Sequence, residues 1–129
     1  MIDSMQNRTV ELSVPAHRDM MLVLRLTTAG VVARAGLGVD RINDVKMAVE
    51  EACALIIETA RADMLRLTFA TDADALIICI CGGACECECA DEDEMQVVRC
   101  ILESLVDDVQ FCRTESGAGS VRLRVALGK

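Results

Sequence analysis

The chain has 129 residues, 53% of them apolar, which suffices for one compact domain with a single core and argues against disorder. Thirteen Lys and Arg against 21 Asp and Glu leave a formal net charge of −8. Most of such a surface repels phosphate backbones, which argues against nucleic acid as the main partner. Trp and Tyr are absent and only two Phe occur, so we expect an aliphatic core in which Met and Cys fill gaps.

Membrane and secretory signals are also missing from the sequence. The longest apolar run, residues 75–85, is too short for the roughly 20 residues of a spanning helix. The first eight residues lack the apolar stretch of a signal peptide. We therefore expect a cytoplasmic protein, without a membrane segment, whose eight cysteines stay reduced.

The first third of the chain predicts a strand and then a helix. Alternating apolar residues favour a strand over Thr9–Val14, which Pro15 ends. A helix follows from Arg18 to about Ala35, and Gly36 and Gly38 stop it. The residues expected on its apolar side are Met21, Leu22, Leu24, Leu26 and Val32.

A second helix is predicted from the N-cap Asp40 to about Ala60. Its apolar residues recur on one stripe, so this helix should lie against a sheet. The stripe holds Ile42, Val45, Val49, Ala52 and Ile56.

The rest of the chain predicts two hairpins with a helix between them. Strands Met64–Ala70 and Ala75–Cys81 flank a tight turn over 71–74, and Gly82 and Gly83 break the pattern. A third helix begins near Asp93, and its apolar residues are Val97, Val98, Ile101, Leu102 and Leu105. The closing hairpin pairs about Val109–Thr114 with Ser120–Leu127 across residues 115–119.

The element order β-α-α-β-β-α-β-β predicts a two-layer α/β (α+β) sandwich. In it, three helices cover one face of a mixed sheet. No linker, repeat or second boundary is visible, so residues 1–129 are expected to form one domain.

Several stretches resemble the anti-sigma factor serine/threonine kinases. Val10–Ala16, Leu24–Thr27 and above all Ile42–Cys53 (INDVKMAVEEAC) resemble the N-terminal half of that family. Ile101–Val109 resembles the helix that follows its glycine-rich box. The matches frame nearly the whole chain, and the resemblance implies the Bergerat fold of the GHKL, or histidine kinase-like, ATPases. The element order derived from the residues agrees with that fold.

The resemblance also implies an ATP site, which can be checked position by position. In the first box, a Glu would act as general base and an Asn four residues later would hold the Mg²⁺ bound to ATP. Glu51 occupies the base position, whereas Leu55 stands at the Asn position and has no oxygen for a hard cation. By helical phase Leu55 is expected off the buried stripe, facing the site. Without a metal ligand beside it, Glu51 is predicted to be a solvated helix carboxylate and only a vestigial base.

The two glycine-rich boxes of the family are altered as well. After the strand the family reads D-x-G-x-G, its Asp reading the adenine amino group, but this chain has Gly82-Gly-Ala84-Cys. The glycines that would cradle the phosphates are replaced by the acidic run Asp91–Glu94, which repels a triphosphate. The three changes together predict a pseudokinase, with no ATP or Mg²⁺ bound.

Five cysteines crowd between Cys79 and Cys89. If the C-E-C-E-C run is extended, the thiols of Cys85, Cys87 and Cys89 share one face, as Zn²⁺ or Cu(I) sites require. Structural zinc sites usually have wider C-x₂₋₄-C spacings, so we favour a second interpretation. In it Cys79 and Cys81 are small core residues and the other three are a remnant of the lid. The cysteines outside this cluster, Cys53, Cys100 and Cys112, are expected to fill the core. His17 is expected to lie at the surface.

Three functions remain open at this point. The leading one is a regulatory protein-binding module that resembles an anti-sigma factor, binds a sigma factor or an anti-anti-sigma protein, and forms a homodimer. The second is an active serine/threonine protein kinase acting on an anti-anti-sigma partner, with Glu51 as base. The third is a metal- or thiol-responsive regulator that uses the cluster Cys79–Cys89.

Overall fold

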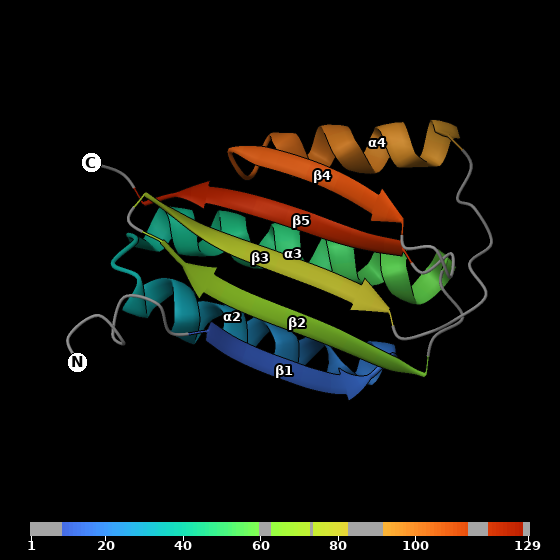
Figure 1. Cartoon of the computed structure of the whole chain (residues 1–129), viewed down its shortest axis with the longest axis horizontal. Helices are drawn as coiled ribbons and strands as arrows, with labels where there is room; N and C mark the ends of the chain where they lie inside the picture. Colours follow the sequence, from blue (N-terminus) through green and yellow to red (C-terminus); the bar gives the residue numbers. More distant parts are fainter. Residues whose placement is uncertain (1–8, 60–62, 73, 83–91, 114–118, 128–129) are drawn as a thin grey trace.

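The computed structural model describes residues 9–59, 63–72, 74–82, 92–113 and 119–127. They form a five-stranded sheet with helices packed on one of its faces (Figure 1). The predicted element order is confirmed. The elements are β1 (Thr9–Pro15), the 3₁₀ helix η1 (Arg18–Met20), α2 (Met21–Arg34), α3 (Val39–Thr59), β2 (Met64–Thr71), β3 (Ala75–Gly82), α4 (Glu92–Glu103), β4 (Asp108–Arg113) and β5 (Gly119–Ala126). No described helix is both long and apolar enough to cross a bilayer.

The sheet has the strand order β1-β2-β3-β5-β4, and each described pairing is antiparallel. The expectation of a mixed sheet was therefore wrong in this detail. The reason lies in the second hairpin: β5 inserts between β3 and β4, so the two strands joined through α4 run the same way without being neighbours.

Helix α2 ends where the glycines predicted. Gly36 has a φ of +91°, a conformation that favours glycine, and its N–H donates to the Ala33 carbonyl at 3.0 Å. The Leu37 N–H donates to the Val32 carbonyl at 3.4 Å. These two bonds form a Schellman motif, which satisfies carbonyls at the end of the helix and turns the chain toward α3.

The predicted apolar side of α2 is only half right. Leu24 and Val32 are fully buried, but Leu22 and Leu26 are 58% and 63% exposed. Because this helix is apolar on more than one side, periodicity does not reveal which side faces the core. The ion pair Arg25–Glu50 joins its outer surface to α3, and the ion pair Arg18–Glu58 joins the preceding helix η1 to α3.

Helix α3 is the central element of the core. Its predicted stripe is confirmed, since Val45, Val49, Ala52 and Ile56 are buried and Ile42 packs against them. The helix starts slightly earlier than predicted: the Ile42 N–H donates to the Gly38 carbonyl at 2.9 Å. Asp40 therefore lies inside the first turn rather than at the N-cap, where its charge favours the helix dipole.

The buried surface of α3 is wider than its stripe. It contacts α2 on one side, α4 on the other, and strands β2, β3 and β5 beneath. As a result Leu55 is only 5% exposed and belongs to the core cluster. The expectation that this side chain would lie off the buried stripe and face an open cleft was wrong, because a helix flanked on both sides buries more than one stripe.

Helix α4 covers the β4 end of the sheet. Leu102 is fully buried, and Val98 and Leu105 pack against the core. Val97 and Ile101, predicted on the same side, are exposed. The guanidinium of Arg99 lies 4.7 Å from the centre of the Phe111 ring on β4, a cation–π contact.

The turn between β2 and β3 is built on Asp72. Its Oδ1 accepts the Asp74 and Ala75 N–H groups, both at 2.8 Å. These two bonds, with a smaller contribution from the charge of Arg124, hold the pKa of Asp72 below its ordinary value. An Asx turn of this kind fixes the register of the hairpin.

Replacing Leu55 by Asn is expected to lower the free energy of unfolding by about 2–5 kcal/mol, because it removes buried methyl groups and buries an amide. The matched control is Glu51→Gln, one turn earlier on the exposed side, which should change it by less than about 0.5 kcal/mol. Urea unfolding measures both values. A Leu55→Asn protein as stable as the control would contradict the buried placement.

The thiol of Cys53 should be chemically inert in the folded protein. Burial, reinforced by the charge of Glu50, raises its pKa to about 12. At pH 8 an alkylating reagent should modify the exposed Cys100 and leave Cys53 unmodified until the protein unfolds, which peptide mass spectrometry can follow. Since the folded pKa lies above the unfolded value, this thiol stabilises the fold fully below about pH 8.5 and progressively less as the pH rises toward 12. Rapid modification of Cys53 in the native protein would contradict this.

Candidate functional site

The residues predicted to form a nucleotide site lie toward one end of the molecule. The C-terminal ends of α3 and β3 and the first turn of α4 all lie at that end (Figure 1). Glu51 and Leu55 occupy successive turns of α3, and Gly82 is the last residue of β3. Ala84 lies outside the described residues, as do Cys85, Cys87 and Cys89.

Glu51 is exposed on α3, and its carboxylate forms no hydrogen bond or ion pair with another residue that the structure describes. Its neighbour Glu50 is engaged by Arg25 of α2. A carboxylate of this kind can accept a proton from a nearby hydroxyl, but it needs a bound and oriented phosphate donor to do chemistry.

The chemistry of the two other described positions of the implied site does not fit Mg²⁺ and ATP. Leu55 has a hydrocarbon side chain packed into the core, so it offers no oxygen to a cation that is coordinated by oxygens. Gly82 is buried and paired with Leu65, and it has no side chain to accept the adenine amino group. We therefore derive no nucleotide-dependent step from Leu55 and Gly82.

The cysteines of β3 differ from the expectation. Cys79 and Cys81 are half-buried on the face of the sheet opposite the helices, so they are not core residues. The Sγ of Cys81 lies 3.8 Å from the Arg66 carbonyl oxygen. Among the described residues, no three Cys, His, Asp or Glu side chains come together as a metal site would require.

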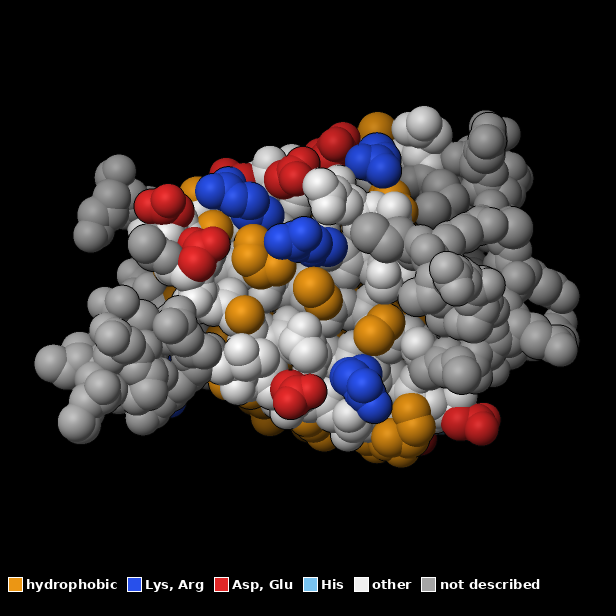
Figure 2. All heavy atoms as spheres, in the orientation of Figure 1, with side chains coloured by type: hydrophobic (Ala, Val, Ile, Leu, Met, Phe, Trp, Pro, Cys, Tyr) orange, Lys and Arg blue, Asp and Glu red, His pale blue; other side chains and the backbone are white. Residues whose placement is uncertain are grey.

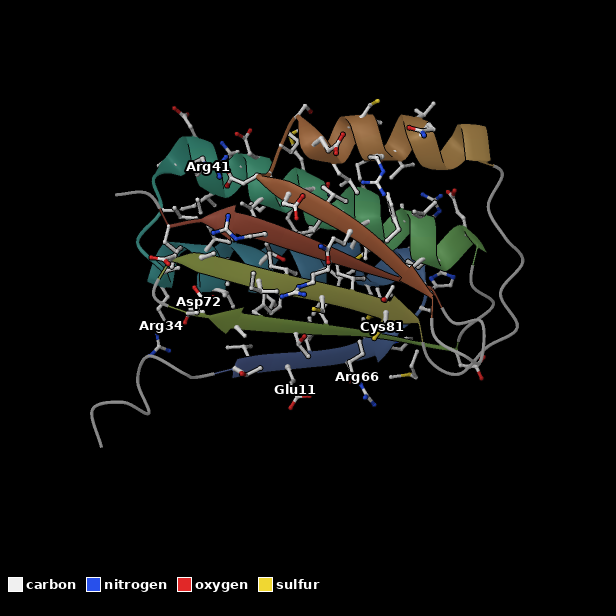
Figure 3. The ribbon with its side chains drawn as sticks, turned by 45° about the horizontal axis from the view of Figure 1, so that its top comes forward. Glu11, Arg34, Arg41, Arg66, Asp72 and Cys81 are labelled. Carbon is white, nitrogen blue, oxygen red and sulfur yellow. The ribbon has the colours of Figure 1, made fainter. Side chains whose placement is uncertain are left out.

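The face of the sheet that carries these cysteines is not covered by a helix (Figure 2). Small and apolar side chains lie along its middle with charged ones around them (Figure 2), and Arg66 and Glu11 stand on β2 and β1 (Figure 3). Strand register and alternation put Arg122, Arg124 and Asp108 on the same face. We call it the open sheet face. Its three arginines outnumber its two acids in a chain of net charge −8. The alternation Val121-Arg-Leu-Arg-Val125 could have revealed it, since period two puts both arginines opposite the core.

A second unusual surface lies on α2. Leu22, Val23 and Leu26 are 58%, 40% and 63% exposed, and together they span about 100° of the helix circumference. We call them the α2 patch. Sequence reasoning placed Leu22 and Leu26 in the core and so missed this surface.

Comparisons with known proteins agree with the fold and the resemblance. The profile of the histidine kinase-like ATPase domain matches residues 14–125. The serine-protein kinase RsbW of Halalkalibacterium halodurans is 42% identical over 55 residues, 43% of this chain and 34% of the relative. The serine-protein kinase RsbW of Bacillus cereus is 41% identical over 51 residues, 40% of this chain and 32% of the relative. The matches thus reach about a third of the length of these relatives.

Among solved structures, the chain is similar to the crystal structure of the RsbU and RsbW domains of Rv1364c from Mycobacterium tuberculosis. The TM-score is 0.66 at 12% identity, covering 92% of this chain and 32% of the other. At that identity the likeness shows a shared fold. With the profile match over most of the chain, it follows that this protein belongs to the histidine kinase-like ATPase domain family.

Proposed function

We propose that this protein is a regulatory protein-binding module that resembles an anti-sigma factor and has lost the nucleotide chemistry of its family. The observation that carries this proposal is Leu55, a buried hydrocarbon side chain at the position where the family's Mg²⁺ ligand is implied. The partner is a sigma factor, an anti-anti-sigma protein or both, as the resemblance implies.

The burial of Leu55 strengthens the argument against metal binding. An exposed leucine could swing aside and let water complete the coordination of a cation. A leucine held in the core cannot do so without leaving a cavity, which destabilises the fold. The sequence also places three acids, Glu92, Asp93 and Glu94, in the first turn of α4, where a phosphate cradle would need uncharged backbone donors.

The exposed surfaces support binding in place of catalysis. Leu22 and Leu26 stand outward next to the Arg25–Glu50 ion pair, and apolar side chains with a polar rim are typical of protein contacts. A partner that covers the α2 patch would bury these side chains from water without needing any reaction at Glu51.

The open sheet face supports a homodimer. Its arginines and its edge acids would face each other across a two-fold axis, and the apolar middle strip would be buried. We therefore propose that dimer contacts come from this face or from α2, and that the cysteines between Cys85 and Cys89 are not required.

The nucleotide part of the proposal predicts no thermal stabilisation by Mg²⁺ and ATP at millimolar concentration, because ligand stabilisation scales with RT ln(1 + [L]/Kd). Differential scanning fluorimetry measures it. A shift of several degrees would instead support the active kinase. In that case Glu51→Gln is the deciding variant: an active kinase would keep the shift and lose phosphate transfer to an anti-anti-sigma protein.

The assembly part predicts a dimer by light scattering, equally with and without reductant. The dimer should survive replacement of Cys85, Cys87 and Cys89 by Ser and should dissociate in Arg122→Glu or Leu22→Glu, which place charge on the two candidate surfaces. The matched control is Arg41→Glu. Arg41 forms an ion pair with Asp107 at 2.7 Å and belongs to neither candidate surface. Loss of the dimer in the Ser variant, or zinc retained stoichiometrically through desalting, would instead favour the metal- or thiol-responsive regulator. A monomer would contradict the dimer.

A further inference from the structure

A hollow of about 500 Å³ lies between α2 and the end of the sheet where β1 begins. It exists because α2 packs mainly against α3, so its other side stands clear of the strands. Thr27, Gly30 and Arg34 form one stripe of the helix along the hollow, since residues three and four apart share a side. A Cβ built on Gly30 meets nothing within 4 Å, which shows that the space there is empty of protein atoms.

The inner wall of the hollow is apolar. Phe69 and Leu76 are almost fully buried beneath it, and Val10 and Leu26 form its partly exposed sides. Hydroxyl-bearing Thr9, Thr27 and Thr71 lie among them. A volume of several hundred Å³ with mainly apolar walls and few polar groups is typical of small-molecule sites.

The charge at the hollow comes from Arg34, in the last turn of α2. Its guanidinium pairs with no carboxylate of another described residue. The carboxylate of Asp72 lies at the same end of the molecule (Figure 3), but it does not line the hollow, and its Oδ1 accepts two amides of its own turn. One cation beside an apolar wall therefore defines the recognition chemistry of this hollow.

We propose that the hollow binds a small amphiphile with an apolar body and a carboxylate head, a medium-chain fatty acid being the simplest example. The apolar chain would contact Val10, Leu26 and Val31 above the buried Phe69 and Leu76, and the carboxylate would pair with the guanidinium of Arg34, whose fork of donors matches it. The site is separate from Glu51 and Leu55, and the inference does not rest on the proposed function.

The test is titration of the full chain with decanoate and, separately, with decanol, followed by calorimetry and by amide shifts in NMR spectra. Decanoate should bind with saturable shifts at Thr27, Gly30 and Thr71, and decanol should bind more weakly. Arg34→Gln should weaken decanoate binding about tenfold or more and leave decanol unchanged, because a charge-assisted pair is lost.

Two further variants distinguish binding in the hollow from non-specific binding to exposed apolar surface. A Cβ at position 30 meets no neighbouring atom within 4 Å, and leucine favours a helix more than glycine does. Gly30→Leu should therefore stay folded, occupy the hollow and lose decanoate binding. Leu22→Ser removes an exposed side chain of the α2 patch that does not line the hollow, and it should bind decanoate as the parent does. The proposal is overturned by an absence of saturable binding, by equal affinity of Gly30→Leu and the parent, or by loss of binding in Leu22→Ser alone.

Discussion

The burial of α3 is the constraint on which the rest of the structure depends. This helix touches α2, α4 and three strands, so the faces of both other helices are positioned by it. The same burial determines the chemistry available at its C-terminal half. Leu55 must satisfy the core, and a polar metal ligand there would need an open cleft that the packing does not leave. In the proposed function, the fold of α3 and the loss of the implied metal site are two results of one packing arrangement.

Much of the fold could be predicted from local chemistry. The alternation in β2 and β5, the Asp72 turn and the glycines after α2 act over a few residues, so the sequence suffices to place them. The prediction failed where burial depends on which elements pack together in three dimensions. Leu26 and Val97 look like core residues by period, yet they are exposed, because only packing determines which apolar side of a helix is covered. The direction of β4 relative to its neighbours likewise follows from strand insertion, which no local pattern encodes.

The candidate site likewise has features that the sequence predicts and features that depend on packing. Leu55 has no oxygen ligand and Gly82 has no side chain, and both features follow directly from the residue types in the sequence. Whether Leu55 points into a cleft or into the core depends on α4 lying beside α3, which helical phase cannot show. The hollow beside Gly30 and Arg34 could not be predicted, because it arises from the packing of α2 mainly against α3, beside strands far along the chain.

The edge position of β1 has a consequence for local opening. This strand is hydrogen-bonded on one side only, to β2, and its partners lie beyond both helices in the sequence, Ala70 standing opposite Thr9. Closing such a long loop costs entropy that neither hairpin of the sheet incurs, so β1 docks late and detaches first. Amide hydrogen exchange in β1 would then proceed by a smaller opening than that of β3, which has a strand on each side. Thr9 and Val10 form one wall of the hollow, so each detachment of β1 from β2 also opens the hollow. A ligand that contacts both β1 and α2 would therefore slow amide exchange in β1.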